Sequence, residues 1–272
     1  MRVGFIGLGS QGGPMARRIA AAGHPLVLWA RRPQMLEPFA DCGATVADSP
    51  AALAAASDLV CLCVVGDADV EQVVGGPEGV LSGLAPGGVI AVHSTVHPDT
   101  CLALAETAAT RGVHVVDAPV SGGGQAAAEG RLLVMAGGES GVVQRCRPVF
   151  DAYAGHVLHL GSTGAGQVAK LLNNLLFTAH LAAAASAFTL GEELGVDRAR
   201  LGEVLTNGTA NSFALSAIAP MNGSLEVLAA HAGDLLRKDV GLVGDLVGRA
   251  GAARGAVVEA AEAALTLMSA HR

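Results

Sequence analysis

Residues 3–12 read VGFIGLGSQG, an apolar run followed at once by three spaced glycines. The run Val3–Ile6 is typical of a buried parallel strand, and alanine-rich helical spacing follows over residues 12–22. The glycines fit the pattern G-x-G-x-x-G in the strand–turn–helix context that a dinucleotide-binding loop requires. In such a loop, the helix N-terminus offers unpaired N–H groups to a pyrophosphate. The predicted cofactor-binding loop comprises Gly7, Leu8, Gly9, Ser10, Gln11 and Gly12. A glycine-rich turn without a ligand is the alternative.

Apolar runs continue to alternate with helical patterns after this loop. The predicted strands are 3–6, 26–29, 59–65, 89–92, 113–117, 132–136 and 156–160. The predicted helices are 12–22, 33–40, 50–56, one after Pro98, and 140–152. Strands that alternate with helices predict a doubly wound α/β domain.

The pattern changes after Gly166, and no strand-like segment follows. The predicted helices here are 167–194, 198–206, 212–220, 224–229, 233–248 and 253–269. The glycine-rich stretch GSTGAG at 161–166 is typical of a hinge. We therefore predict an α/β Rossmann-type N-terminal domain, residues 1–162, that binds the dinucleotide. An all-α C-terminal domain, residues 163–272, follows for substrate binding and oligomerisation.

The composition excludes several classes of protein. With 272 residues, 51% hydrophobic residues and a net charge of −7, the chain is not disordered. Aromatic residues make up only 3% and there is no basic run, which argues against nucleic-acid binding. Five cysteines in a long chain fit a reducing compartment, so we expect a cytoplasmic protein. The apolar stretch 175–190 is shorter than the roughly 20 residues of a membrane span, so we expect a core helix and no membrane contact.

The end of the second predicted strand indicates which dinucleotide binds. An acidic residue there would bind a ribose 2′-hydroxyl, whereas arginine favours a 2′-phosphate. This sequence has Arg31 and Arg32, and no acidic residue until Glu37. Two guanidinium groups can hold a phosphate, so we predict NADP, with NAD possible.

Only two of the 17 basic residues are lysines, Lys170 and Lys238. Lysine can release its proton when it is partly removed from water, whereas arginine effectively cannot, so both are candidates for function. Lys170 and Asn174 are four residues apart and share one face of a predicted helix. A lysine beside an amide can exchange a proton with a substrate hydroxyl or carbonyl.

Four separated blocks, together with Lys238-Asp239, resemble the β-hydroxyacid dehydrogenases, which include 3-hydroxyisobutyrate dehydrogenase and the tartronate and succinic semialdehyde reductases. The blocks are Gly4–Gly12 with Pro14-Met15, Ser94-Thr95 with Pro98, Asp117–Gly123 continuing to Gly138, and Gly166–Lys170 with Asn174. His93 departs from the usual pattern, which has a small or acidic residue before Ser94. The segment 229–236 also lacks the phenylalanine expected before Lys238.

The resemblance implies an NAD(P)-dependent oxidoreductase that interconverts a small β-hydroxyacid and its semialdehyde. Lys170 would be the general acid/base and Asn174 would orient the substrate. The implied carboxylate-binding residues are Ser121, Gly122 and Gly123, a hydroxyl and a nest of backbone N–H groups. The implied cofactor contacts are Val64, Val65, Thr95 and Lys238.

Two alternatives stay open at this point. An imine reductase shares the glycine loop and the long helix but usually lacks the lysine, and a non-catalytic NADP-binding protein is the second alternative. The apolar surface of the long helix predicts a homodimer or homotetramer. No histidine or cysteine group has the spacing of a metal site, so no metal is expected. We expect Asp117 to brace the substrate loop, and His93 to be a core histidine.

Overall fold

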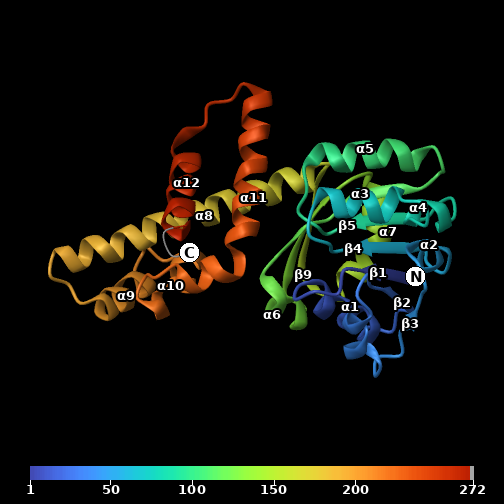
Figure 1. The fold of residues 1–272 in the computed structure, drawn as a ribbon, viewed down its shortest axis with the longest axis horizontal. Coiled ribbons are helices and arrows are strands. Elements are labelled where there is room, and N and C mark those ends of the chain that lie inside the picture. The colour runs from blue at the N-terminus through green and yellow to red at the C-terminus, as the bar shows by residue number, and fades with distance from the viewer. Residues whose placement is uncertain (270–272) are drawn as a thin grey trace. The chain divides into compact units, whose positions relative to one another are not determined.

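The computed structural model describes residues 1–269 and divides the chain into two compact units. The first is Met1–Lys170 and the second begins at Leu171, inside the long helix α8 (Ala165–Glu193) that runs through the division (Figure 1). The boundary predicted from the sequence, between 162 and 163, lies just before this helix.

A nine-stranded sheet forms the centre of the first unit. Its strands are β1 (Val3–Ile6), β2 (Leu26–Trp29), β3 (Thr45–Val46), β4 (Leu59–Leu62), β5 (Val89–Val92), β6 (His114–Asp117), β7 (Val120–Ser121), β8 (Leu132–Gly137) and β9 (Ala154–Gly161). Their order is β3-β2-β1-β4-β5-β6-β8-β7, with β9 paired to β8. The strands β1 to β6 pair in parallel, and β8 runs antiparallel to β6 and β7. The order reverses between β1 and β4, which is where a doubly wound sheet binds its ligand. The predicted fold class is confirmed.

Helices cover both faces of this sheet. Because side chains alternate along a strand, Phe5 and Cys61 face one layer while Ile6 and Leu62 face the other. The first layer contains α1 (Gly12–Ala21), α6 (Gly123–Ala128) and α7 (Ser140–Phe150). The second layer contains α2 (Pro50–Ala55), α3 (Asp67–Gly75), α4 (Val80–Gly83) and α5 (Pro98–Ala109). The two cores hold the carboxyl ends of β1, β4, β5 and β6 at one edge.

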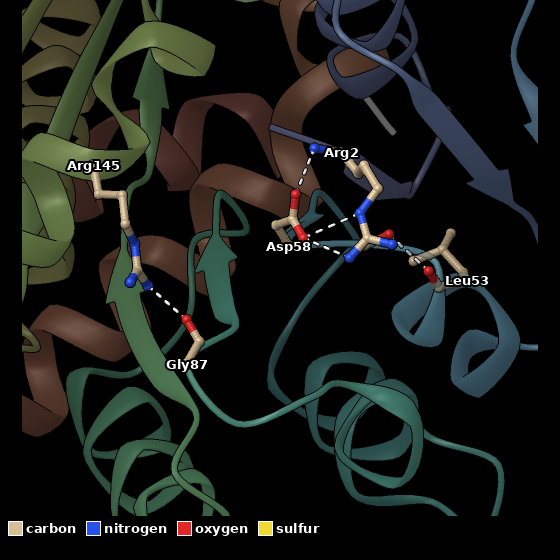
Figure 2. Close-up of polar contacts among 6 residues, drawn as sticks. Arg2, Leu53, Asp58, Gly87 and Arg145 are labelled. Carbon is tan, nitrogen blue, oxygen red and sulfur yellow. Dashed lines mark hydrogen bonds and ion pairs between the residues drawn. The ribbon is translucent and has the colours of Figure 1, made fainter.

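Polar contacts fasten the sheet at the start of its strands, away from that edge (Figure 2). The Arg2 guanidinium donates to Asp58 at 2.6 Å, and the Arg2 backbone N–H donates to the other carboxylate oxygen at 2.9 Å. This hydrogen bonding lowers the pKa of the Asp58 carboxyl. Arg145 of α7 donates to the Gly87 carbonyl at 2.8 Å, which ties α7 to the segment before β5.

Within its described residues, 171–269, the second unit contains helices and connecting loops but no strand. After α8 come α9 (Arg198–Asn207), α10 (Phe213–Ile218), a 3₁₀ turn at Ala219–Met221, α11 (Glu226–Ala250) and α12 (Gly255–Ser269). The side chains of Asp197 and Ser212 cap α9 and α10. By length and composition alone α8 could cross a membrane, but half of its most apolar stretch is buried within the chain, as in a core helix.

Several sequence predictions were wrong in detail. The helices expected at 224–229 and 233–248 are one helix, α11, because Ala229 and Gly233 are both buried one turn apart and the helix packs continuously. The helix expected at 33–40 is two 3₁₀ turns, Pro33–Met35 and Glu37–Phe39, each with a proline in its first turn. The short elements β3, β7, α4 and α6 were missed, since so few residues show no clear period. Helix α3, which has nine residues, was missed as well.

Candidate active site

The glycine loop is closely packed at Gly7 and Gly12 and faces open space at Gly9. A Cβ on Gly12 would lie 2.0 Å from the Gly7 carbonyl oxygen, and one on Gly7 would lie 2.2 Å from the Cys63 carbonyl oxygen. Gly7 also has a φ of 101°, which favours glycine. A Cβ on Gly9 would meet nothing within 4 Å. The loop therefore approaches β4 closely while Gly9 faces open space, as a pyrophosphate-binding loop must.

A cavity of about 470 Å³ adjoins this loop. It is lined by the loop itself, the end of β2, the segment after β4, and α3, and it includes Gly7, Leu8, Gly9, Trp29, Arg31, Arg32, Val64, Val65 and Asp69. Trp29, the single tryptophan, forms part of its wall. The Arg31 guanidinium lies 3.3 Å from the Asp69 carboxylate, and Arg32 is exposed. The sequence reasoning found both arginines but gave no role to Asp69, which partly neutralises Arg31.

A hydrogen bond joins the segment after β4 to the segment after β5. The predicted strand 59–65 ends at Leu62, because the Val64 N–H donates to the Ser94 hydroxyl at 2.8 Å and leaves the sheet. Val64 is half-buried and Val65 is exposed, and both line the cavity. Thr95, half-buried, follows Ser94 at the same edge. The predicted contacts Val64, Val65 and Thr95 therefore lie at the carboxyl ends of neighbouring strands.

Gln167 was missed by the sequence reasoning. Its side chain is fully buried in the first turns of α8, where it donates to the Ser94 carbonyl at 2.8 Å and accepts from the Val96 N–H at 3.2 Å. These two bonds hold Thr95 between them. The sequence shows only a glutamine three residues before Lys170, and nothing in the sequence indicates its burial or its partners.

The Asp117 carboxylate braces the start of α8, not the substrate loop as expected. It accepts from the Gly164 N–H at 2.7 Å and from the Gln167 N–H at 2.9 Å. Burial raises the pKa of Asp117, and these backbone hydrogen bonds oppose that rise. A Cβ on Gly137 or Gly166 would come within 3 Å of this carboxylate, so both glycines make room for it.

Lys170 follows Gln167 by one helical turn and is 9% exposed. Asn174 lies one further turn along α8, so the two predicted catalytic residues share a helix face. The Asn174 amide donates to the buried Asp239 carboxylate at 2.6 Å, which fixes its orientation. The Lys238 ammonium lies 3.1 Å from Asp239, so its predicted cofactor contact stays a prediction.

The predicted carboxylate nest lies beside the glycine loop. Ser121 ends β7, and Gly122 and Gly123 have φ values of 131° and 77° and are exposed. A Cβ on the next residue, Gly124, would lie 2.4 Å from the Ser10 carbonyl oxygen. The fold thus brings together two motifs that are more than 100 residues apart in the sequence.

Matches to known proteins agree with this geometry. Residues 2–161 match the family model of the NAD binding domain of 6-phosphogluconate dehydrogenase. Residues 164–271 match the model described as the NAD-binding of NADP-dependent 3-hydroxyisobutyrate dehydrogenase. The L-threonate dehydrogenase of Cupriavidus necator is 36% identical over 89% of this chain and 82% of its own. The chain belongs to the 3-hydroxyisobutyrate dehydrogenase family.

Solved members of the 3-hydroxyisobutyrate dehydrogenase family share the whole architecture. The 3-hydroxyisobutyrate dehydrogenase of Mycobacterium tuberculosis, solved with L-serine, has a TM-score of 0.87 at 30% identity and covers 100% of this chain and 95% of its own. Another neighbour, solved with NADP⁺, has a TM-score of 0.84 at 26% identity. An imine reductase from Pseudomonas has a TM-score of 0.65 at 20% identity and shares the fold alone. The resemblance found in the sequence is confirmed, and the chain is an NAD(P)-binding oxidoreductase of this family.

Within the described residues no group of three or more histidine, cysteine or acidic side chains could hold a metal. His159 instead lies 2.8 Å from the Gly138 carbonyl oxygen. All five cysteines are free, and Cys61, Cys101 and Cys146 are buried.

Proposed function

We propose that this protein is an NADP-preferring β-hydroxyacid dehydrogenase that interconverts a small hydroxyacid and its semialdehyde. The observation that carries the proposal is the placement of Lys170. It is buried one turn after Gln167, whose amide holds the loop that contains Thr95. A dinucleotide fits the residues present, because Gly9 faces open space beside the cavity that Arg31 and Arg32 line.

Lys170 is suited to move a proton at the reacting oxygen. A bound nicotinamide supplies or accepts the hydride. As carbonyl becomes hydroxyl, the Lys170 ammonium donates a proton to the oxygen, and in the reverse direction the neutral amine removes it. The Asn174 amide, oriented by Asp239, would bind the same oxygen or its neighbour.

A carboxylate substrate is supported by half-buried Ser121 and the exposed Gly122 and Gly123, whose hydroxyl and backbone N–H groups would bind the carboxylate. Relatives that act on L-threonate and 3-hydroxyisobutyrate support a small hydroxyacid. Which acid the enzyme takes is open to a panel assay.

The preference for NADP rests on Arg31 and Arg32. Asp69 works against it, because a carboxylate 3.3 Å from Arg31 repels a 2′-phosphate. Arg32→Ala should therefore lower kcat/KM for NADPH by about 10-fold or more with little change for NADH, the loss of one charge-assisted hydrogen bond. Asp69→Asn should raise kcat/KM for NADPH. Equal effects of Arg32→Ala on both cofactors would reject the preference.

The test of the reaction is nicotinamide absorbance with wild type, Lys170→Ala and Lys170→Arg. The substrates are glyoxylate, succinic semialdehyde, tartronate semialdehyde, a cyclic imine, L-threonate and 3-hydroxyisobutyrate. We expect turnover of an aldehyde acid or hydroxyacid, lowered about 10²- to 10⁴-fold in both variants. Quenching of Trp29 by NADPH controls for cofactor binding. Turnover that survives in Lys170→Ala, or turnover of the imine alone, would reject the proposal.

We further propose a cytoplasmic homodimer or homotetramer. The five unpaired cysteines support a reducing compartment. Leu172 and Leu176, one turn apart on α8, are 54% and 49% exposed, an apolar stripe that a second copy would cover. Light scattering after gel filtration should give a multiple of the chain mass, and a monomer at micromolar concentration would reject this assembly.

A further inference from the structure

A buried aromatic cluster lies in the sheet layer behind the active-site loops, and the proposed reaction does not use it. His93, directly after β5, is 3% exposed, and Tyr153, between α7 and β9, is fully buried. The His93 ring stacks on Phe5 with the centroids 6.4 Å apart, and meets the edge of Phe150 at 5.7 Å. An apolar side chain would fill this space as well, so the presence of two polar ring nitrogens here needs an explanation.

Both ring nitrogens of His93 have partners that settle its tautomer. Nδ1 lies 2.6 Å from the Ala118 carbonyl oxygen, which can only accept, so Nδ1 carries the hydrogen. Nε2 lies 3.1 Å from the Tyr153 hydroxyl, which therefore donates to it. Burial lowers the pKa of His93 to about 4 and raises the pKa of Tyr153, so both groups are neutral near pH 7.

The Ala118 peptide that His93 holds leads directly to the substrate nest. Its N–H donates to the Val92 carbonyl at 2.8 Å, so residues 92 and 93 bind both sides of Ala118. Three residues later Ser121 begins the nest. On its other side His93 continues into Ser94, whose hydroxyl accepts from Val64 at the cavity. His93 thus joins two segments: its ring binds the Ala118 carbonyl before the nest, and its backbone leads into the Ser94–Thr95 loop.

We propose that His93 is a positioning residue for the substrate nest. Its Nδ1–H fixes the Ala118 carbonyl, and through it Ser121–Gly123, relative to the Ser94–Thr95 loop, while Tyr153 holds the ring in the required tautomer. The effect on substrate rests on the proposed function, but the effect on the loop does not. The sequence predicted a core histidine at this position, and the two hydrogen bonds of the ring assign it a further role.

Two substitutions separate the two ring contacts. In His93→Asn the amide nitrogen takes the place of Nδ1 and keeps the donor to Ala118, while the reach to Tyr153 is lost. In His93→Gln the amide takes the place of Nε2, so the contact with Tyr153 is kept and the donor to Ala118 is lost. Tyr153→Phe removes only the hydroxyl. All three leave a buried polar group without its partner, so we expect each to lower Tm, and Tm does not distinguish them.

The decisive measurement is substrate KM with NADPH saturating. We expect His93→Gln to raise KM about 10-fold, the loss of one buried hydrogen bond, and His93→Asn to stay within about 3-fold of wild type. Tyr153→Phe should be intermediate. The Kd for NADPH, from Trp29 quenching, should change little in any of them. Equal rises in KM for His93→Asn and His93→Gln would overturn the proposal and leave His93 with a packing role.

Nuclear magnetic resonance can test the same hydrogen bonds of His93 without any turnover of substrate. Ring ¹⁵N shifts of wild-type His93 should report hydrogen on Nδ1, and Tyr153→Phe should mix the tautomers. Backbone amide signals of Gly122 and Gly123 should move in His93→Gln and Tyr153→Phe but not in His93→Asn. Hydrogen on Nε2, or unmoved glycine signals in every variant, would overturn the proposal. Failure of the proposed function would instead show as wild type that turns over no acid while these signals behave as expected.

Discussion

Alanine at two positions of the same glycine loop should affect two different properties: Gly12→Ala should lower stability, and Gly9→Ala should weaken cofactor binding. In Gly12→Ala the added methyl group would lie 2.0 Å from the Gly7 carbonyl oxygen and 3.0 Å from the Cys63 and Phe5 side chains. The backbone must move, because a carbonyl cannot turn aside as a flexible side chain can. In Gly9→Ala the methyl group meets no protein atom within 4 Å. It enters the space that a pyrophosphate would take.

The magnitudes follow from these distances. Overpacking a tight site costs about 1–3 kcal/mol, so Gly12→Ala should lower Tm by about 2–12 °C at 2–4 °C per kcal/mol. Gly9→Ala should leave Tm within about 2 °C, since an exposed change away from packing stays within about 0.5 kcal/mol. Its cost appears on binding, where loss of one hydrogen bond to a charged phosphate, about 1.5–3 kcal/mol, raises Kd for NADPH about 10- to 150-fold.

Trp29 makes both effects measurable in one sample. It is the only tryptophan and it lines the cavity, so its emission should be quenched as NADPH binds and should also report unfolding. Gly23→Ala, in the open turn after α1, tests the effect of losing a glycine elsewhere, though its φ of 83° adds strain. If Gly9→Ala binds NADPH as wild type does, the loop does not hold the pyrophosphate. If Gly12→Ala matches wild type in Tm, the contact distances are not limiting.

Three further outcomes are expected. Asp117→Asn should lower the free energy of unfolding by about 1–3 kcal/mol in urea titrations, because an amide oxygen replaces only one of the two acceptors used by Gly164 and Gln167; an unchanged midpoint would contradict this account. The free energy of unfolding of the wild type should fall by up to about 3 kcal/mol between pH 6.5 and 4. The reason is that His93 binds a proton in the unfolded chain over this range, whereas the native ring, with its pKa of about 4, stays neutral until the lower pH. His93→Asn should lack that slope. Asp58→Asn should lower Tm slightly at pH 7, and the difference should shrink as the pH falls through the lowered pKa of Asp58; a difference that persists would implicate packing.

The fold could be predicted from the sequence where the apolar pattern of a segment alone indicates that the segment is buried. Val3–Ile6, Leu26–Trp29 and Val89–Val92 have their predicted bounds, because a parallel strand covered on both faces is a continuous apolar run. Elements whose limits depend on distant partners were harder. The strand through Leu62 ends early because the Val64 N–H donates to the hydroxyl of Ser94, which is 30 residues away, and not to a neighbouring strand.

The candidate site divides in the same way. The glycine loop and Lys170 were found because their chemistry is local: a spacing of glycines, and a rare lysine beside an amide. Gln167 and the role of Asp117 were not found, because each acts through backbone groups 47 to 73 residues distant in the chain. The effect of Asp69 on Arg31 was not predicted for a related reason, since nothing in the segment around Asp69 indicates that it faces Arg31.

His93 shows what a departure from a family pattern can indicate. Beside a motif, a buried polar residue in place of a small one costs free energy unless a partner accompanies it. That partner is Tyr153, 60 residues further along, the single tyrosine of a chain that is only 3% aromatic. The sequence shows the departure at His93, but nothing in it pairs His93 with Tyr153. Together they replace a packing contact with two directed hydrogen bonds, and the direction matters because one of them ends on the peptide that leads into the substrate nest.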